Sequence, residues 1–130
     1  MKSLLAPAWG RHIMVRSAGT QAAHGLPAEP GAVRAALEHG ADIAGHRSRA
    51  IDGPLIASAN LILVMERQQA RFIQSTAPVA PDALRLLGEF ADGERTPEIP
   101  DPYGGSFAVY RRCGHMIRRC LDGVIDFICQ

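Results

Sequence analysis

Apolar positions along the chain follow two spacings, one typical of strands and one typical of helices. Leu61–Met65 is a continuous apolar run, as expected for a parallel strand that is covered on both faces. Shorter apolar runs predict two further strands, at His12–Arg16 and at Leu84–Leu87. The small residues of Ser17–Thr20 then indicate a turn after the first of these strands.

Helical spacing predicts three helices between and after these strands. Pro30 suits the first turn of a helix, where its missing amide N–H is not needed, and Gly40 ends that helix. A polar-faced helix is predicted for Glu66–Thr76, and a long helix for Ser106–Phe127. The residues expected to face inward from the first helix are Val33, Ala36 and Leu37. The apolar stripe of the long helix is Val109, Cys113, Met116, Cys120, Val124 and Phe127.

This order of elements predicts the fold class. Strands that alternate with helices indicate an α/β domain with a parallel sheet. The 130 residues fit one domain, residues 1–130, which is large enough to bury its own core. Hydrophobic residues make up 47% of the chain and charged residues 21%, which is an ordinary globular balance.

Charge and cysteine content narrow the function classes. The net charge of +1 provides no electrostatic basis for binding nucleic acid or an anionic membrane. No apolar run reaches membrane-spanning length, and no signal pattern opens the chain. The three cysteines, all at or beyond position 113, form no disulfide framework, so we predict a cytoplasmic protein. The histidines lack metal-ligand spacing, and we expect neither a metal nor a cofactor.

The segment Glu98–Ser106, with sequence EIPDPYGGS, carries the clearest chemical signal. Prolines on both sides of Asp101 exclude a helix or a central strand, and they favour extended backbone for Ile99 and Asp101. Asp101 is therefore predicted on a stiff, exposed loop, two positions before the ring of Tyr103. A carboxyl group held in this way suits general acid catalysis on an aromatic leaving group. The alternative is an acidic turn before a helix, and the spacing alone does not separate the two.

Other stretches run in a fixed order around this acidic segment. They are Val15–Thr20, Gly25–Pro30, Glu38–Gly40 with Asp42 and Ile43, Gly45–Arg49, Ala59–Arg67 and Leu86–Phe90. With the acidic segment they resemble the low-molecular-weight protein tyrosine phosphatases, closest to the bacterial branch associated with exopolysaccharide export. The resemblance covers nearly everything from Arg11 onward, and the acidic segment is its most specific part.

The resemblance implies a flavodoxin-like, three-layer domain with parallel strands in the order 2-1-3-4. Family members open with a buried strand, a phosphate loop of the form Cys-x5-Arg, and a helix. Met1 falls partway down that helix, so about twenty residues are expected to be missing, including the first central strand and the phosphate loop. The strands at His12–Arg16 and Leu61–Met65 would then flank an empty slot. We expect these strands to pair directly, another chain to fill the slot, or the polypeptide not to fold alone.

The resemblance also implies an activity, phosphotyrosine hydrolysis through a phosphocysteine intermediate. Asp101 would act as general acid and then as general base, and Tyr103 would stack on the phenol ring. Leu26 would border the substrate cleft. His46 matches a histidine that supports the phosphate loop, and here it would lack its partner. The implied partner is a phosphotyrosine protein such as a bacterial tyrosine kinase, and exposed strand edges favour self-association.

Cys113 and Arg119 formally satisfy the Cys-x5-Arg spacing. A phosphate loop must turn its N–H groups inward, which favours glycine and other residues that tolerate unusual backbone angles. His115–Ile117 instead continues the apolar stripe of the long helix. We therefore expect Cys113 and Cys120 to be packing residues.

Three readings of the function follow. The leading one is an N-terminally incomplete form of a tyrosine phosphatase, because Lys2–Leu5 continues as a helix with no new start signal. The alternative is a catalytically inactive relative that acts as a binding or regulatory module. A minor alternative is a relative of the arsenate reductases. In the first two readings, the chain by itself is expected not to hydrolyse aryl phosphates.

Overall fold

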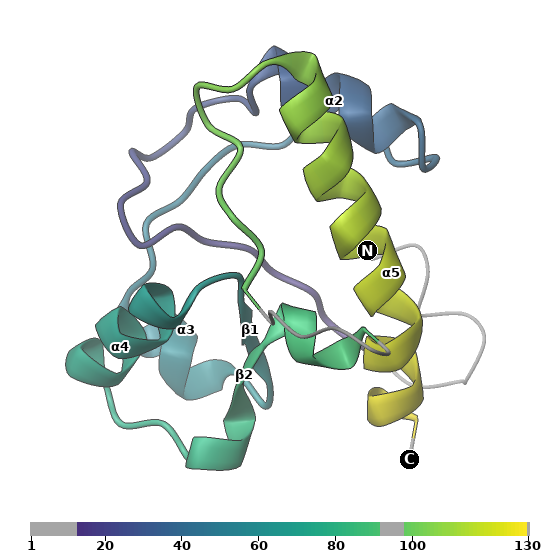
Figure 1. The fold of residues 1–130 in the computed structure, drawn as a ribbon. Coiled ribbons are helices and arrows are strands. Elements are labelled where there is room, and N and C mark those ends of the chain that lie inside the picture. The colour runs from purple at the N-terminus through teal and green to yellow at the C-terminus, as the bar shows by residue number, and fades with distance from the viewer. Residues whose placement is uncertain (1–12, 92–97, 130) are drawn as a thin grey trace.

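The structure, a computed structural model, describes residues 13–91 and 98–129 (Figure 1). Two strands, β1 (Ile62–Val64) and β2 (Leu84–Leu86), pair in parallel, with Ile62 opposite Leu84 and Val64 opposite Leu86. Both lie within the apolar runs that predicted them. Helix α4 (Arg67–Thr76) and the 3₁₀ turn η1 (Pro81–Ala83) form the crossover that a parallel pair requires.

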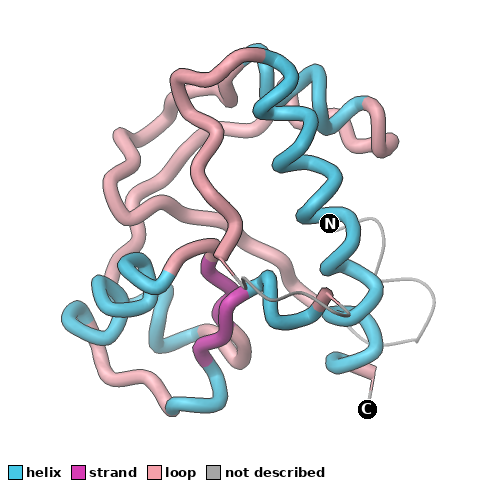
Figure 2. The backbone as a smooth tube through the Cα atoms, in the orientation of Figure 1, coloured by secondary structure: helices cyan, strands magenta, loops and turns pink. Residues whose placement is uncertain are grey.

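Apolar residues cover both faces of this small sheet. Val64 and Leu86 pack with Ile56 of α3 (Gly53–Ser58) and Ile73 of α4. On the opposite face, Leu63 and Met65 pack against a second cluster that includes buried residues of α5 (Phe107–Ile128). Alternate residues of a strand point to opposite faces, which is why one strand serves both clusters. The result is the predicted α/β architecture, with helices in layers on either side of a parallel sheet (Figures 1 and 2).

Helix α2 (Pro30–Leu37) begins at the predicted proline and packs on the first half of α5. Its predicted inward residues are partly wrong, since Leu37 is 55% exposed and Ala35 is the buried one. Ala35 is the residue of α2 that faces α5, where a Cβ atom on Gly114 would lie in ordinary contact, 3.7 Å from the Cβ of Ala35. Small residues at the crossing, rather than the larger Leu37, thus face the neighbouring helix.

The long helix predicted at Ser106–Phe127 is confirmed as α5, but the ends of its buried face differ from the predicted apolar stripe. Cys120 and Val124 are buried, and Cys113 and Met116 pack against the same cluster. Val109 and Phe127 are 38% and 37% exposed, whereas Tyr110 is buried. The buried face therefore begins one residue later than predicted, at a position that lies in line with Cys113.

The predicted strand at His12–Arg16 is wrong for the residues that the structure describes. Residues 13–16 form no strand, and their amides donate no backbone hydrogen bond to any other described residue. A strand is stable only beside another strand, and neither of the two described strands pairs with this segment. Direct pairing with β1, one of the expected outcomes, is therefore not found. Figure 2 draws residues 13–29 as loop.

The chain shortly after this segment is held by two hydrogen bonds at Gly19. The Gly19 N–H donates to the Arg49 carbonyl oxygen at 2.9 Å, and the Ile51 N–H donates to the Gly19 carbonyl oxygen at 3.0 Å. His12 and the helix predicted at Lys2–Leu5 lie outside the described residues.

Helix α3 was not predicted, although its start carries a signal. The Asp52 carboxylate caps it by accepting from the Leu55 N–H at 2.9 Å, and Pro54 occupies its first turn. No helix in the described part of the chain is long and apolar enough to cross a bilayer.

Candidate functional site

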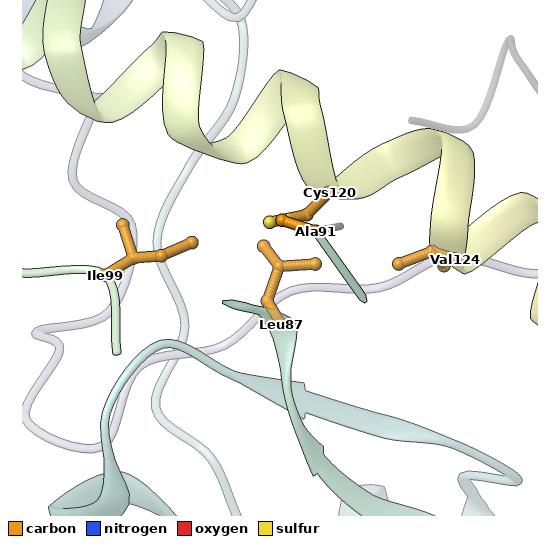
Figure 3. Packing of buried hydrophobic residues seen from close by; sticks show 5 residues of the cluster. All are labelled: Leu87, Ala91, Ile99, Cys120 and Val124. Atoms are coloured by element: carbon orange, nitrogen blue, oxygen red, sulfur yellow. The ribbon is translucent and has the colours of Figure 1, made fainter. Parts of the chain in front are cut away.

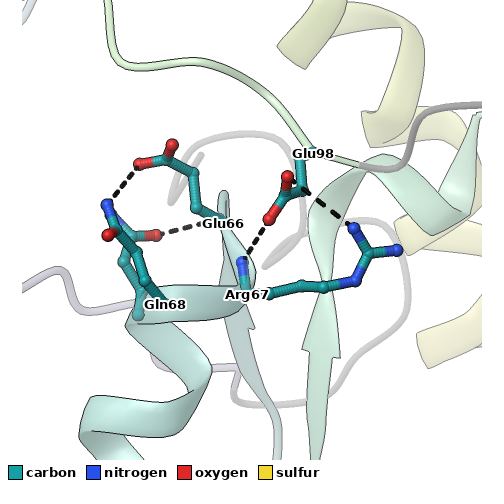
Figure 4. Close-up of polar contacts among 5 residues, drawn as sticks. Glu66, Arg67, Gln68 and Glu98 are labelled. Carbon is teal, nitrogen blue, oxygen red and sulfur yellow. Dashed lines mark hydrogen bonds and ion pairs between the residues drawn. The ribbon is translucent and has the colours of Figure 1, made fainter.

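The loop at Glu98–Ser106, here called the acid loop, is fastened to the carboxyl end of β1. The Ile99 N–H donates to the Met65 carbonyl oxygen at 2.9 Å. The Glu98 carboxylate accepts from the Arg67 N–H at 2.7 Å, and its second oxygen lies 3.7 Å from the Arg67 guanidinium (Figure 4). The carboxyl ends of parallel strands are where α/β domains bind ligands. The acid loop therefore starts at a favoured position for a site.

Ile99 anchors the acid loop from the inside. It is 2% exposed and belongs to the cluster of Leu87, Ala91, Cys120 and Val124 (Figure 3). Burial of an isoleucine side chain stabilises by roughly 1.5–3 kcal/mol. The residue two positions before Asp101 is thus locked in the core, while Asp101 itself is exposed.

Asp101 is positioned by a local turn. Its Oδ1 accepts from the Tyr103 N–H at 3.0 Å, which is an Asx turn. The Gly105 N–H then donates to the Pro102 carbonyl oxygen at 2.9 Å, and Gly104 adopts a φ of +80°, which favours glycine. The exposed loop expected around Asp101 is confirmed. The second carboxylate oxygen of Asp101, Oδ2, is available to a ligand.

Tyr103 is 74% exposed and forms one wall of an open pocket of about 500 Å³, here called the Tyr103 pocket. The pocket lies where the acid loop passes between the start of α2 and the start of α5. Besides glycines, its lining residues are Glu29, Pro30, Arg34, Tyr103, Phe107 and Tyr110. Aromatic rings with one acidic and one basic side chain make this a surface suited to binding a side chain of another molecule.

Tyr110 lies under this pocket as a buried phenol. Burial raises its pKa above the ordinary tyrosine value, and the nearby Glu29 carboxylate raises it further. A backbone hydrogen bond from Gly104 opposes the rise, while Asp101 and Tyr103 add to it. Acidic groups thus dominate the electrostatic surroundings of the Tyr110 hydroxyl, which stays protonated at neutral pH.

Leu26 and His46, the other two predicted site residues, are not among the residues that line the Tyr103 pocket. The Leu26 backbone pairs with Ser48: its N–H donates to the Ser48 hydroxyl at 3.0 Å, and its carbonyl oxygen accepts from the Ser48 N–H at 2.8 Å. The His46 Nε2 lies 3.3 Å from the Ser17 hydroxyl. His46 therefore has a partner, contrary to the expectation that it would lack one. Leu26 is 54% exposed and is not among the residues lining the pocket.

Cys113 lies within α5, as does the whole Cys-x5-Arg stretch that ends at Arg119. Amides inside a helix are committed to its own carbonyl groups, so this stretch does not form a phosphate-binding loop. Burial raises the pKa of the Cys113 thiol, and the Asp101 carboxylate raises it further. Cys120 is buried, and its thiol donates to the Met116 carbonyl oxygen at 3.2 Å. Both cysteines pack in the core cluster, as predicted.

No group of three or more His, Cys, Asp and Glu side chains in the described ranges is placed to hold a metal ion.

Four residues that line the Tyr103 pocket were not predicted from the sequence: Glu29, Arg34, Phe107 and Tyr110. For Tyr110 a signal was present, because it precedes Cys113 and Ile117 at helical spacing. Glu29, Arg34 and Phe107 carried no such signal, because they come together only where α2 packs against α5.

Comparison with known proteins places this geometry in a family. The profile described as low molecular weight phosphotyrosine protein phosphatase matches residues 1–128. A Ralstonia nicotianae protein named "Probable low molecular weight protein-tyrosine-phosphatase EpsP" is 37% identical over 116 residues, covering 89% of this chain and 77% of that protein. Etp of Escherichia coli K12, a low molecular weight protein-tyrosine-phosphatase, is 31% identical, covering 82% of this chain and 70% of Etp.

Solved structures agree. The tyrosine phosphatase Wzb from Escherichia coli K30, in complex with sulphate, superposes with a TM-score of 0.76 at 28% identity, covering 85% of this chain and 76% of Wzb. The YwlE arginine phosphatase from Geobacillus stearothermophilus superposes with a TM-score of 0.77 at 30% identity, covering 87% of this chain and 72% of YwlE. The fold and the acid loop define an α/β phosphatase-type domain. The chain belongs to the low molecular weight protein tyrosine phosphatase family, in the branch that its motifs predicted.

Proposed function

We propose that this chain provides the residues that bind and protonate the tyrosyl leaving group in a phosphotyrosine hydrolysis site. Asp101 is the general acid, and Tyr103 stacks on the tyrosyl ring of the substrate. The observation that carries the proposal is the anchoring of the acid loop, which holds Asp101 in solvent above the carboxyl end of β1 while Ile99 is locked in the core. A carboxyl group fixed in this way loses little entropy when it meets a leaving oxygen.

The proposed reaction has two steps. A cysteine thiolate attacks phosphorus, the bond from phosphorus to the tyrosyl oxygen breaks, and the Asp101 carboxyl group protonates that oxygen. A phosphocysteine results. Water then attacks phosphorus, the Asp101 carboxylate accepts its proton, and the sulfur–phosphorus bond breaks to release phosphate. The unperturbed pKa of an aspartate is about 4, so acid catalysis near neutral pH requires the negatively charged phosphate nearby.

The printed 130 residues contain no nucleophile suited to the first step. Cys113 is the only cysteine followed by an arginine at the phosphate-loop spacing, and it lies in α5 with a raised thiol pKa. We therefore propose that the chain by itself is inactive toward aryl phosphates. An inactive chain of this kind still presents Asp101 and Tyr103 to a partner.

The test is an assay of p-nitrophenyl phosphate hydrolysis by the purified chain between about pH 5 and pH 7, the range suited to a carboxyl acid. We expect no rate above the uncatalysed background. Turnover that Cys113→Ser abolishes would contradict the proposal, because it would make Cys113 the nucleophile.

The converse test uses the chain extended at its N-terminus with the phosphate-loop segment of a relative. If the extended chain hydrolyses aryl phosphates, Asp101→Asn should slow loss of the aryl group by roughly 10²–10⁴-fold. Asp82→Asn, at an exposed aspartate in η1, is the matched control and should leave the rate unchanged. An unchanged rate in Asp101→Asn would remove Asp101 from the mechanism.

The second candidate function is a binding or regulatory module without catalysis. It is favoured by the exposure of Tyr103 and by a pocket that the described residues form by themselves. Because the phosphate cradle of the family is not among these residues, a phosphotyrosine peptide should bind weakly. A micromolar Kd in titration calorimetry would contradict that expectation. An arsenate-reductase-like function is the least supported, since Cys113 and Cys120 are packing residues.

The partner proposed on these grounds is a phosphotyrosine protein such as a bacterial tyrosine kinase, met in the cytoplasm. Self-association is proposed through β1, which pairs with β2 on one side and with no other described strand on its second side. Unpaired strand edges offer donors and acceptors to a second chain.

A further inference from the structure

The Tyr103 pocket has one carboxylate without a partner. Glu29 is the N-cap residue of α2, yet its side chain makes no capping hydrogen bond. Within the described ranges, no ion pair involves Glu29. Its negative charge is therefore directed at solvent and at the pocket, where a bound group can meet it.

The one basic side chain of the pocket is already occupied. The guanidinium carbon of Arg34 lies 3.8 Å from the centroid of the Phe107 ring, which is close cation–π contact. Phe107 thus shows that the aromatic lining of this pocket accepts a cation. Tyr103 and Tyr110 provide two further rings for which no cation is present among the described residues.

The backbone around the pocket does not favour an anion. Helix N-termini bind anions through free N–H groups, but Pro30 stands at the first position of α2 and has no N–H. The Tyr110 ring also covers Gly31, since a Cβ atom there would lie 2.6 Å from the ring. Of the two charged side chains that line the pocket, Arg34 already contacts the Phe107 ring, so the charge left to meet a ligand is that of Glu29.

We propose that the Tyr103 pocket binds a cationic side chain, lysine or arginine, of the partner protein, beside the tyrosyl ring that Tyr103 receives. The Glu29 carboxylate pairs with the charge, and the exposed ring of Tyr103 contacts it. This inference deepens the proposed function, because it rests on Tyr103 as the residue that meets the substrate tyrosine. It assigns a preference for basic residues next to that tyrosine.

The test compares two unphosphorylated peptides by NMR titration of the ¹⁵N-labelled 130-residue chain. One is acetyl-Ala-Lys-Tyr-Lys-Ala-amide, and the other has norleucine in place of both lysines. Norleucine keeps most of the side-chain length and removes the charge. The amides of Gly31, Gly104 and Gly105 report on the pocket. We expect the lysine peptide to bind about 3- to 10-fold more tightly, as expected for one cation–π contact plus one exposed ion pair.

Two variants should move the ratio of the two affinities, lysine peptide over norleucine peptide, in opposite directions. Glu29→Gln removes the carboxylate and should lower the ratio to the part that the cation–π contact provides by itself. Arg34→Gln removes the competing cation and frees the Phe107 ring, so the ratio should rise. Glu89→Gln is the matched control, because Glu89 pairs with Arg85 at 2.9 Å outside the pocket. It should leave the ratio unchanged.

Equal binding of the two peptides, or tighter binding of a peptide with glutamates in place of the lysines, overturns the inference. So does a ratio that Glu29→Gln leaves intact. The peptides carry no phosphate, so this outcome is independent of the hydrolysis assays. A lysine preference in a chain whose extended form fails to hydrolyse aryl phosphates would support the pocket and reject only the proposed catalysis.

Discussion

At the scale of single residues, Asp101 and Cys113 interact across two elements. Asp101 is exposed on the acid loop, and Cys113 is half-buried in α5 below it. Burial raises the pKa of the Cys113 thiol, and the negative charge of Asp101 adds to that rise. Since the thiolate is the reactive form of cysteine, both effects make Cys113 unreactive at neutral pH.

This relation predicts the rate at which the cysteines react with iodoacetamide. Cys113 should be alkylated more slowly than the exposed Cys129 at pH 7, and its rate should still be rising with pH above the ordinary thiol pKa of about 8.5. Peptide mass spectrometry of a time course measures both rates in one sample. Asp101→Asn should speed the alkylation of Cys113, whereas Asp122→Asn on the exposed face of α5 should not. Faster reaction of Cys113 than of Cys129 at pH 7 would contradict this view.

At the scale of elements, two glycines of α5 meet different neighbours. A Cβ atom on Gly123 would overlap the carbonyl oxygen of Phe90, which belongs to the 3₁₀ turn η2 (Leu87–Phe90). A Cβ atom on Gly114 would have its nearest neighbours at 3.7 Å, which is ordinary contact. Gly123 therefore allows η2 and α5 to approach, and Gly114 serves no such purpose.

The pair predicts opposite changes in stability for the same substitution. Gly114→Ala should raise the free energy of unfolding by about 0.5–1 kcal/mol, because alanine is the better helix former. Gly123→Ala should lower it by about 1–3 kcal/mol, because backbone cannot move aside as a flexible side chain can. Urea unfolding followed by circular dichroism measures both. Equal effects of the two substitutions would show that the contact with Phe90 is not tight.

At the scale of the whole molecule, the two apolar clusters determine which segments are held in place by packing. Each cluster lies on one face of the β1–β2 sheet, and together they hold α3, α4 and the second half of α5. The segment 13–16 belongs to neither cluster and has no backbone hydrogen bond to other described residues. Amides resist exchange in proportion to the cost of opening the structure around them.

Hydrogen exchange should therefore divide the chain. Amides of Ile73 and Val124, which are buried within α4 and α5, should be the most protected, and those of residues 13–16 should exchange nearly as fast as in an unfolded peptide. Exchange measured by NMR at two protein concentrations provides the control for self-association through β1, which would raise protection only in the more concentrated sample. Protection of residues 13–16 equal to that of Val124 in a dilute sample would refute this description.

Local rules were enough to predict much of this protein. The two short strands, the start of α2 at Pro30 and the long helix α5 follow from residue periodicity and from the geometry of proline. The acid loop follows from Pro100 and Pro102, which exclude regular structure whatever the rest of the chain does. These features depend on neighbours within a few residues, and such information is present in any stretch of sequence.

Other features depended on contacts between distant segments. An apolar run such as Ile13–Arg16 becomes a strand only if a second strand lies beside it, and here Gly19 bonds to residues before α3 instead. The partner of His46 is Ser17, brought close by the same crossing of loops. The Tyr103 pocket exists because α2 packs on α5 and brings Glu29 to the acid loop. The sequence by itself determined the two short strands, the long helix α5 and the exposed position of Asp101, because these follow from local backbone preferences. Only the tertiary structure decided which side chains gather around Tyr103, because that depends on how the helices pack.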